Sequence, residues 1–435
     1  MKRNRKTVLM LFCTLLPLYC WGQLHYIGLK QTVTTPPNDA IYSQFRPKCR
    51  VIDSYVYVCT NTGIYRKDLT VTADTIWEPF ALKDIPVTEF VKNGDKLLAI
   101  LPKSRDSLLL LSSDNGRSFI NYTSPHFFAS ERYNYPYRIA QNKQNPHSIL
   151  ILHANYGISK SEDFGRTWKN LNSFIGGYQD RFVAFHPADS LMICYSGETE
   201  FFSSYVQTSF DGGLTWINSE LEDNNCTHSI AFHPVNPDIL VSAGEGRMTQ
   251  STDRGRTWHP AIFPDRYLYF HSIIFDEKNP DTVYASGSSI KNNDTIYVYR
   301  SIDAGDSWQL YYMENMGKDC GGVPDMAKYQ DKLILYTRCE GIYELDLNHT
   351  TAIPASGKIS GGITVYPNPA GDFVYFTNEA GFDFVEIRDV SGRLVTKSRL
   401  SKGNHKMDVS AWSAGIYLAN FHSRNNKITK NIIIK

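Results

Sequence analysis

The feature that most constrains the fold is an eight-residue pattern, Ser-x-Asp-x-Gly-x-Thr/Ser-aromatic, which we call the octapeptide and which occurs five times in the 435 residues. The copies begin at Ser112, Ser161, Ser209, Ser251 and Ser301 and end at Phe119, Trp168, Trp216, Trp258 and Trp308. Their aspartates, Asp114, Asp163, Asp211, Asp253 and Asp303, lie 49, 48, 42 and 50 residues apart. Periods of about 40 to 50 residues are typical of β-propeller blades. The sequence therefore predicts a propeller.

Each octapeptide is expected to form a braced turn between two strands. The Asp accepts backbone N–H groups, and the Gly two residues later adopts a conformation that other residues avoid. These glycines are Gly116, Gly165, Gly213, Gly255 and Gly305. The pattern resembles the Asp box (BNR repeat) of sialidases, sortilin-type receptors and xyloglucanases, which are β-propellers. The resemblance implies that the octapeptides lie away from the ligand face, so we interpret them as structural.

The segments between octapeptides predict the blade number. Four of them carry an apolar strand that ends at Pro or Asn-Pro, within residues 138–146, 182–187, 229–237 and 272–280, because Pro ends a strand and favours a turn. Two further units, Cys59–Leu69 and Cys339–Leu347, lack the octapeptide but share Gly-Ile-Tyr. We therefore predict an all-β chain whose residues 23–350 form a seven-bladed propeller of four-stranded antiparallel blades. Six or eight blades stay possible, because N- and C-terminal strands could share one blade.

The first 22 residues have the pattern of a signal peptide. Lys2, Arg3, Arg5 and Lys6 precede an apolar run from Val8 to Tyr19, which is shorter than the about 20 residues that span a bilayer. We expect cleavage after Gly22, with lipidation at Cys20 as the alternative, and no transmembrane segment in the mature chain. The net charge of +1 and the absence of basic runs after the leader do not favour nucleic acid as a partner.

Export makes disulfides the expected state of the cysteines. Six remain after the leader, namely Cys49, Cys59, Cys194, Cys226, Cys320 and Cys339, an even number in an oxidising compartment. Cys49 could pair with Cys59, and Cys320 with Cys339, each across a hairpin; Cys59 with Cys339 is the rival pairing. No Cys-x-x-Cys is present, so we predict no metal site and no cofactor.

The chain ends in a separate module. An Ala/Ser/Gly/Lys-containing linker, 351–362, precedes residues 363–435, whose strand-like segments carry Pro367, Asn368, Pro369, Gly392, Gly415 and Tyr417. These motifs resemble the C-terminal sorting domain (type A) of the type IX secretion system. The resemblance implies a small immunoglobulin-like β-sandwich, recognition by the secretion machinery, and passage through the periplasm to the outer-membrane surface or beyond. An ordinary immunoglobulin-like accessory domain is the alternative.

A candidate binding face follows from the propeller geometry. If the octapeptides join third to fourth strands, then the residues that open each inner strand and the loops after each second strand share the opposite face. Alignment through the prolines gives Tyr137, Arg181, His228 and His271 as the opening residues, and the loops supply Asn155, Tyr156, Glu198, Glu200, Glu245 and Arg247. Polar loops on a rigid scaffold are where binding sites gather. A packing role for the two histidines is the alternative, and His186 and His233 are expected to serve their turns.

Three functions are compatible with this face. The first is a non-enzymatic module that binds a glycan or a protein. The second is a sialidase-like glycoside hydrolase that uses Arg181 with Glu198 and Glu245, because such chemistry needs two carboxylates about 5 to 10 Å apart; the sialidase arginine motif is incomplete at both Phe45-Arg46-Pro47 and Tyr137–Ala140. The third is an envelope assembly factor. Walker, Rossmann, zinc-protease and serine-hydrolase motifs are absent from the sequence.

Overall fold

The computed structural model describes most of the chain and divides it into two compact units, 1–349 and 350–435. The described residues are 24–29, 48–71, 75–102, 107–122, 136–153, 157–172, 177–199, 204–221, 227–262, 268–289, 295–316, 322–337, 341–348, 363–366, 370–378, 381–389, 392–423 and 427–434. The predicted leader, the linker, Asn155, Tyr156, Glu200, Cys226, Cys320, Cys339 and Pro367–Pro369 lie outside them. The described residues contain no helix with the length and apolar character needed to cross a membrane.

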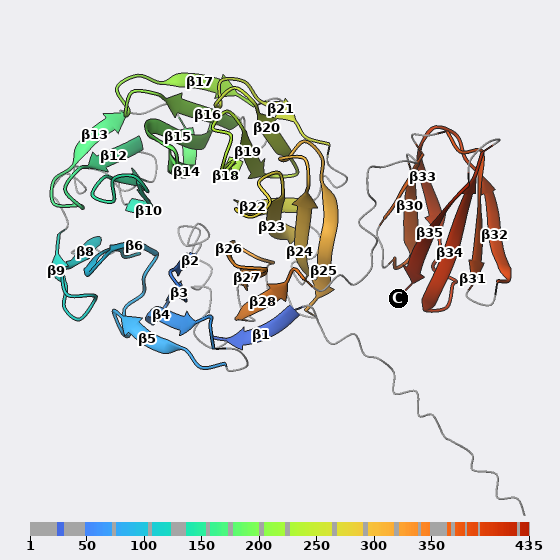
Figure 1. Ribbon diagram of the computed structural model, residues 1–435, viewed down its shortest axis with the longest axis horizontal. Helices are drawn as coiled ribbons and strands as arrows, with labels where there is room; N and C mark the ends of the chain where they lie inside the picture. The colour runs from blue at the N-terminus through green and yellow to red at the C-terminus, as the bar shows by residue number, and fades with distance from the viewer. Residues whose placement is uncertain are drawn as a thin grey trace, which may run out of the picture. The chain divides into compact units, whose positions relative to one another are not determined.

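The first unit is a ring of seven four-stranded antiparallel sheets among the residues that are described (Figure 1). Blades 1 to 6 are β2–β5 (Cys49–Ile52, Tyr55–Thr60, Gly63–Asp68, Glu78–Ala81), β6–β9 (Glu89–Asn93, Lys96–Ile100, Leu109–Ser112, Ile120–Asn121), β10–β13 (Pro136–Gln141, Ile149–His153, Gly157–Ser161, Lys169–Asn172), β14–β17 (Gly177–His186, Asp189–Thr199, Ser204–Ser209, Ile217–Glu220), β18–β21 (Thr227–Phe232, Leu240–Gly244, Met248–Ser251, His259–Pro260) and β22–β25 (Leu268–Phe275, Val283–Ser289, Thr295–Ser301, Gln309–Asn315). In each of them the first strand lies nearest the centre of the ring.

Blade 7 contains strands from both ends of the propeller. It consists of β26 (Asp325–Tyr329), β27 (Lys332–Tyr336), β28 (Ile342–Asp346) and, outermost, β1 (Leu24–Gly28). Strand β1 pairs antiparallel with β28 and places Leu24 opposite Leu345. The predicted seven blades are therefore confirmed, and the ring closes by mixing N- and C-terminal strands.

Every octapeptide begins with the last residue of a third strand and forms the turn to the fourth. In the copy that starts at Ser251, the Oγ of this serine accepts the N–H of Gly255 at 2.8 Å and donates to Asp253 Oδ1 at 2.8 Å. Asp253 Oδ1 also accepts the N–H groups of Arg256 and Thr257, at 3.0 and 2.9 Å. The glycine has a φ of 80°, as predicted, and the residue before it also has a positive φ, 65°. The braced turn is thus built entirely within its own eight residues.

The octapeptide glycines also join neighbouring blades. A Cβ placed on Gly165 would lie 2.6 Å from Cδ2 of Leu98, and one on Gly305 would lie 2.5 Å from Cγ2 of Val241. Both contacts are with the preceding blade, so only glycine permits this approach. The hydrophobic core lies between blades in the same way, since Val241 packs with Phe270 and Val283 of the next sheet.

The predicted disulfides of Cys49, Cys59 and Cys194 are wrong, because all three are free thiols buried in the core. Cys49 lies opposite Val58 in the β2–β3 ladder and packs with it on one face of the sheet. Cys59, the next residue along, packs on the other face with Tyr57. Adjacent strand residues point to opposite faces, so the two sulfur atoms cannot meet. Cys194 contacts the Thr208 hydroxyl at 3.8 Å.

The second unit is a two-sheet sandwich. One sheet contains β29 (Ile363–Tyr366), β30 (Phe373–Asn378) and β33 (Gly403–Asp408), and the other contains β32 (Leu394–Arg399), β31 (Phe384–Asp389), β34 (Gly415–His422) and β35 (Lys427–Ile434). Val374 and Phe376 of the first sheet share a core with Phe421 and Ile432 of the second. Of the predicted sorting residues, Tyr417 is buried and donates its hydroxyl to Ser413 O, and Gly392 and Gly415 have positive φ.

Candidate functional site

The octapeptides and the turns between first and second strands lie on the same face of the propeller. In each blade with an octapeptide, the fourth octapeptide residue donates its N–H to a carbonyl of that turn or of the start of the second strand, for example Arg254 N–H to Asp238 O at 2.9 Å and Ala304 N–H to Asp281 O at 2.8 Å. We call this side the octapeptide face. The inner strands begin, and the second strands end, on the opposite face.

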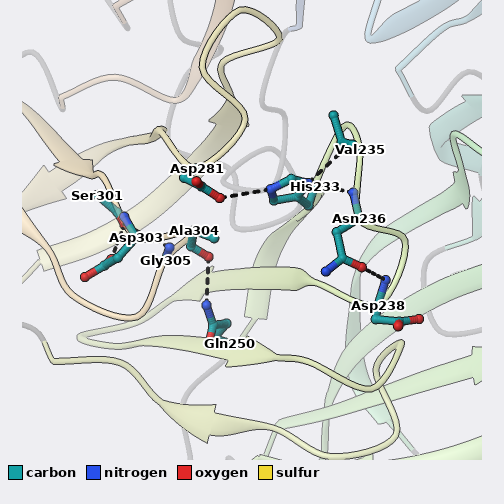
Figure 2. Close-up of polar contacts among 10 residues, drawn as sticks. All are labelled: His233, Val235, Asn236, Asp238, Gln250, Asp281, Ser301, Asp303, Ala304 and Gly305. Atoms are coloured by element: carbon teal, nitrogen blue, oxygen red, sulfur yellow. Dashed lines mark hydrogen bonds and ion pairs between the residues drawn. The ribbon is translucent and has the colours of Figure 1, made fainter.

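The octapeptide face is held together by turn chemistry that also crosses between blades (Figure 2). His233 Nδ1 accepts the N–H groups of Val235 and Asn236, at 3.1 and 2.9 Å, and its Nε2 lies 3.4 Å from Asp281 Oδ1 of the next blade. Gln250 donates to Ala304 O at 3.0 Å. His186 accepts the N–H of Ala188 in the equivalent way, and its burial lowers its pKa. Both histidines serve their turns, as their sequence context indicated.

On the opposite face, the four aligned opening residues occupy one structural position. Each is the extra residue of a β-bulge between the first and second strands of its blade: Tyr137, Arg181, His228 and His271. The inner strands of the other three blades, β2, β6 and β26, pair without a shift. A bulge redirects the side chain of the extra residue and often lies beside a functional site. Blades 3 to 6 therefore differ from the rest of the ring at this level.

The bulges of blades 5 and 6 bring His228 and His271 into contact. The two rings stack with centroids 5.2 Å apart, and their Nδ1 atoms are 3.1 Å apart. His271 Nε2 lies 3.0 Å from Ser288 Oγ. Both side chains are buried, so they do not themselves offer a surface to a ligand. No cluster of three or more metal-ligating side chains occurs within the described parts of the chain.

His228 connects this buried pair to a carboxylate. Its Nε2 lies 3.5 Å from Glu245 Oε1, a distance typical of an ion pair rather than a hydrogen bond. Its Nδ1 lies 3.2 Å from Phe270 O, which can only accept. With a proton on Nδ1, His228 can donate to Phe270 O. His271 then accepts at Nδ1 and donates from Nε2 to Ser288.

The turn between β19 and β20 presents Glu245 beside Arg247. Gly246, with a φ of 70°, donates its N–H to Leu268 O of the next blade at 2.7 Å. Glu245 forms a backbone bridge with Tyr269, which also belongs to that next blade. The Glu245 side chain keeps 35% of its surface exposed, and Arg247 is half-buried. The carboxylate is therefore fixed by its backbone on one side and by His228 on the other.

Two buried acids that the sequence analysis missed tie the inner strands elsewhere in the ring. Glu89 of β6 contacts Arg50 of β2 at 2.5 Å and accepts the N–H of Ile139 in β10 at 3.1 Å. Asp325 of β26 plays the same part at the closing seam. An acid in the first two residues of a regular inner strand is the signal that could have identified both.

Several predicted site residues cannot be placed in this way. The backbones of Tyr137, Arg181 and Glu198 belong to described strands, but their side chains are outside the description. Asn155, Tyr156 and Glu200 lie wholly outside the described residues. The structure thus brings together His228, His271 and Glu245, and places Arg247 two residues from the last.

Comparison with known families identifies the second unit. Residues 364–435 match the family model of the secretion system C-terminal sorting domain. This confirms the predicted type IX sorting domain and its location at the end of the chain. Such a domain indicates export to the outer-membrane surface or the extracellular space, in agreement with the predicted localisation.

Other similarities concern the fold. A curated relative, the probable oligoxyloglucan-reducing end-specific xyloglucanase of Neosartorya fischeri, is 28% identical over 197 residues, which cover 39% of this chain and 22% of the relative. The match thus spans less than a quarter of that protein. Among solved structures, YCF48 bound to D1 peptide has a TM-score of 0.52 at 16% identity and covers 75% of this chain and 97% of its own. An inactive virginiamycin B lyase from Staphylococcus aureus, solved with quinupristin, has a TM-score of 0.54 at 14% identity, with 74% and 99% covered.

Proposed function

We propose that the propeller is a binding module of an exported protein and that it recognises a glycan on the face opposite the octapeptides. The observation that carries the proposal is the run of four equivalent bulges in blades 3 to 6, next to the preorganised Glu245. Strained or irregular backbone that recurs at one level of a repeat needs a reason beyond folding, because blades 1, 2 and 7 form without it.

In this proposal the residues have distinct roles. Glu245 accepts hydrogen bonds from sugar hydroxyl groups, and Arg247 donates to ring or hydroxyl oxygens. His228 and His271 are positioning residues that hold the carboxylate in place. Tyr137, Arg181 and Glu198 are proposed as further ligand contacts from the neighbouring blades. A carboxylate beside a guanidinium suits a polyhydroxylated ligand, since both can form directional hydrogen bonds with it.

The second candidate function is glycoside hydrolysis. The similarity to a probable xyloglucanase favours it. Glu198 and Glu245 would then act as the two carboxylates, which must lie about 5 to 10 Å apart across the bound sugar. In that case one of the two carboxylates would serve as acid and the other as nucleophile or base.

The test is an array of bacterial, host and plant glycans probed with the chain from Gln23 onward, read for both retention of protein and release of free sugar. We expect retention that is lost on Glu245→Gln and Arg247→Ala. Glu162→Gln, on the octapeptide face, where the side chain is 59% exposed, is the matched control. Release of sugar that depends on Glu198 and Glu245 would establish the hydrolase instead. If neither signal appears, a protein ligand replaces the glycan.

A further inference from the structure

The sorting domain exposes aromatic side chains on one of its two outer faces. In the three-stranded sheet, Tyr366 lies opposite Tyr375, which lies opposite Lys406. The alternate residues of these strands, such as Val374 and Phe376, are in the core, so this row points away from it. Phe373 extends the row along β30 and keeps 37% of its surface exposed. We call Tyr366, Phe373, Tyr375 and Lys406 the aromatic face.

Contacts within the aromatic face hold its rings in place. The rings of Tyr366 and Tyr375 are nearly parallel, at 14°, with centroids 5.6 Å apart. The Lys406 ammonium lies 3.6 Å from the centroid of Phe373 and 5.9 Å from that of Tyr375. The electrostatic attraction of this cation–π contact holds the ammonium over the ring. The result is a rigid, largely apolar surface on a sheet.

The outer face of the four-stranded sheet is different, because its polar groups already have partners. Glu386 binds Lys397 at 2.9 Å and Arg388 at 3.3 Å. The Phe384 ring is covered by His422, stacked at 4.7 Å, and by Lys397, 4.0 Å from the ring centroid. The charged groups of this face pair with one another, whereas the aromatic face consists mainly of stacked rings.

The aromatic face lies on the hairpin that carries the sorting motif. Tyr366 directly precedes Pro367-Asn368-Pro369, and Phe373 follows it four residues later. At the base of the same connection, Ala370 donates its N–H to Ile433 O at 2.6 Å, which joins the hairpin to the C-terminal strand β35. The position of the hairpin therefore depends on the last residues of the chain.

The sorting domain and the propeller differ in the sign of their net charge. Residues 363–435 contain 10 basic and 6 acidic residues, whereas residues 23–350 contain 30 and 38. The sorting domain is therefore net positive and the propeller net negative at neutral pH. A partner that reads only the sorting domain gains selectivity from this difference, although the aromatic face itself carries the single, ring-bound charge of Lys406.

We propose that the aromatic face is the surface through which a protein component of the secretion apparatus recognises this chain. The domain's sorting role requires that part of its exterior be read by that apparatus, and the face next to the Pro-Asn-Pro motif has the composition of an interface centre. Partly exposed aromatic rings that already contact one another lose little entropy on binding, and tyrosine is enriched among the few residues that dominate binding energies. The inference depends on the sorting-domain match and not on the glycan proposed for the propeller.

The experiment follows the full-length chain in a Gram-negative host that has this secretion system. Threonine at Tyr366, Phe373 and Tyr375 together removes the rings and keeps strand propensity. Phe384→Thr is the matched control, since it removes a ring with a comparable lysine contact from the other outer face. We expect about a tenfold drop in the fraction of chain that reaches the cell surface or medium, with periplasmic accumulation, for the triple variant alone. Equal sorting of the triple variant and the wild type would overturn the proposal, as would an equal loss in the control.

A second measurement leaves the fold intact. A photoreactive phenylalanine analogue at Tyr375 keeps the ring, and cross-linking in the same cells identifies what contacts it. We expect an adduct with an envelope protein of the secretion apparatus. An adduct with lipid, with a second copy of this chain or with its own propeller would refute the assigned partner. Thermal melting of the purified triple variant separates lost recognition from lost folding, and a wild-type melting temperature is expected.

Discussion

Asp325 offers a quantitative test of how the ring is closed. Its carboxylate lies at the seam where blade 7 meets blade 1 and is buried, with 8% of the side chain exposed. It accepts the N–H of Cys49 at 2.8 Å, the Lys48 ammonium at 3.1 Å and the Ser272 hydroxyl at 3.2 Å. One side chain thus connects the first, sixth and seventh blades.

Asp325→Ala should destabilise the propeller substantially. Removal of one partner from a buried ion pair costs about 3 to 5 kcal/mol, because the other partner stays desolvated. Lys48 keeps 22% of its side chain exposed, so water recovers part of this cost and we take about 3 kcal/mol. For a domain of this size that corresponds to a fall in melting temperature of about 4 °C. Asp325→Asn keeps an acceptor but loses the charge, so it should show about half of the shift.

The assay is calorimetric melting of the chain from Gln23 onward. Glu78→Ala is the control, because Glu78 pairs with Arg66 at 3.0 Å on an outer strand and is 64% exposed. Exposed pairs contribute about 0 to 1 kcal/mol. If Asp325→Ala shifts the propeller transition no more than Glu78→Ala does, the closing role of Asp325 is refuted.

Three further predictions concern the octapeptides and the core. Hydrogen bonds, first that from the Ser118 hydroxyl, hold the pKa of Asp114 at about 2. The stability that Asp114 contributes is therefore complete above about pH 4 and is lost as the pH falls to about 2. Denaturant midpoints over that pH range will measure the loss, and an unchanged midpoint would contradict it. Gly305→Ala should lower the free energy of unfolding by about 3 kcal/mol, since its Cβ would meet Val241 at 2.5 Å. Gly94→Ala, with a φ of 57° and open space around the Cβ, should lower it by about 1 kcal/mol. Equal losses in urea unfolding would show that the contact between blades does not matter. Burial raises the pKa of Cys194 to about 12, so iodoacetamide should alkylate it at neutral pH only after denaturation, and labelling of the folded chain would count against its burial.

The propeller was predictable because its signal is local. The Ser, Asp and Gly of each octapeptide form the turn through contacts within the octapeptide, so the five copies predict five turns without knowledge of the rest of the chain. The partner of Leu24 was not predictable in the same way, because Leu345 lies at the other end of the propeller sequence. The sequence therefore left the blade number open by one.

The cysteine pairing failed through a single residue of register. The turn after Ile52 places Cys49 opposite Val58, and the neighbouring Cys59 faces the other way. A strand pattern with apolar residues on both faces does not reveal such an offset, since a blade is buried on both sides.

The candidate site was only partly predictable. The proline alignment found four equivalent positions, but nothing in the sequence shows that a residue is the extra member of a bulge. His228 and His271 were expected to face a ligand, whereas their side chains are buried and Glu245 is the exposed end of their contacts. The burial of both side chains agrees with the alternative, a packing role for the two histidines.

The pairing of β1 with β28 also sets the order in which the exported chain can finish folding. Blades 1 to 6 each contain only consecutive residues and can form as the chain emerges. Strand β1 has no native partner until Ile342–Asp346 is present. The ring is therefore completed only when nearly all of the propeller is available to fold.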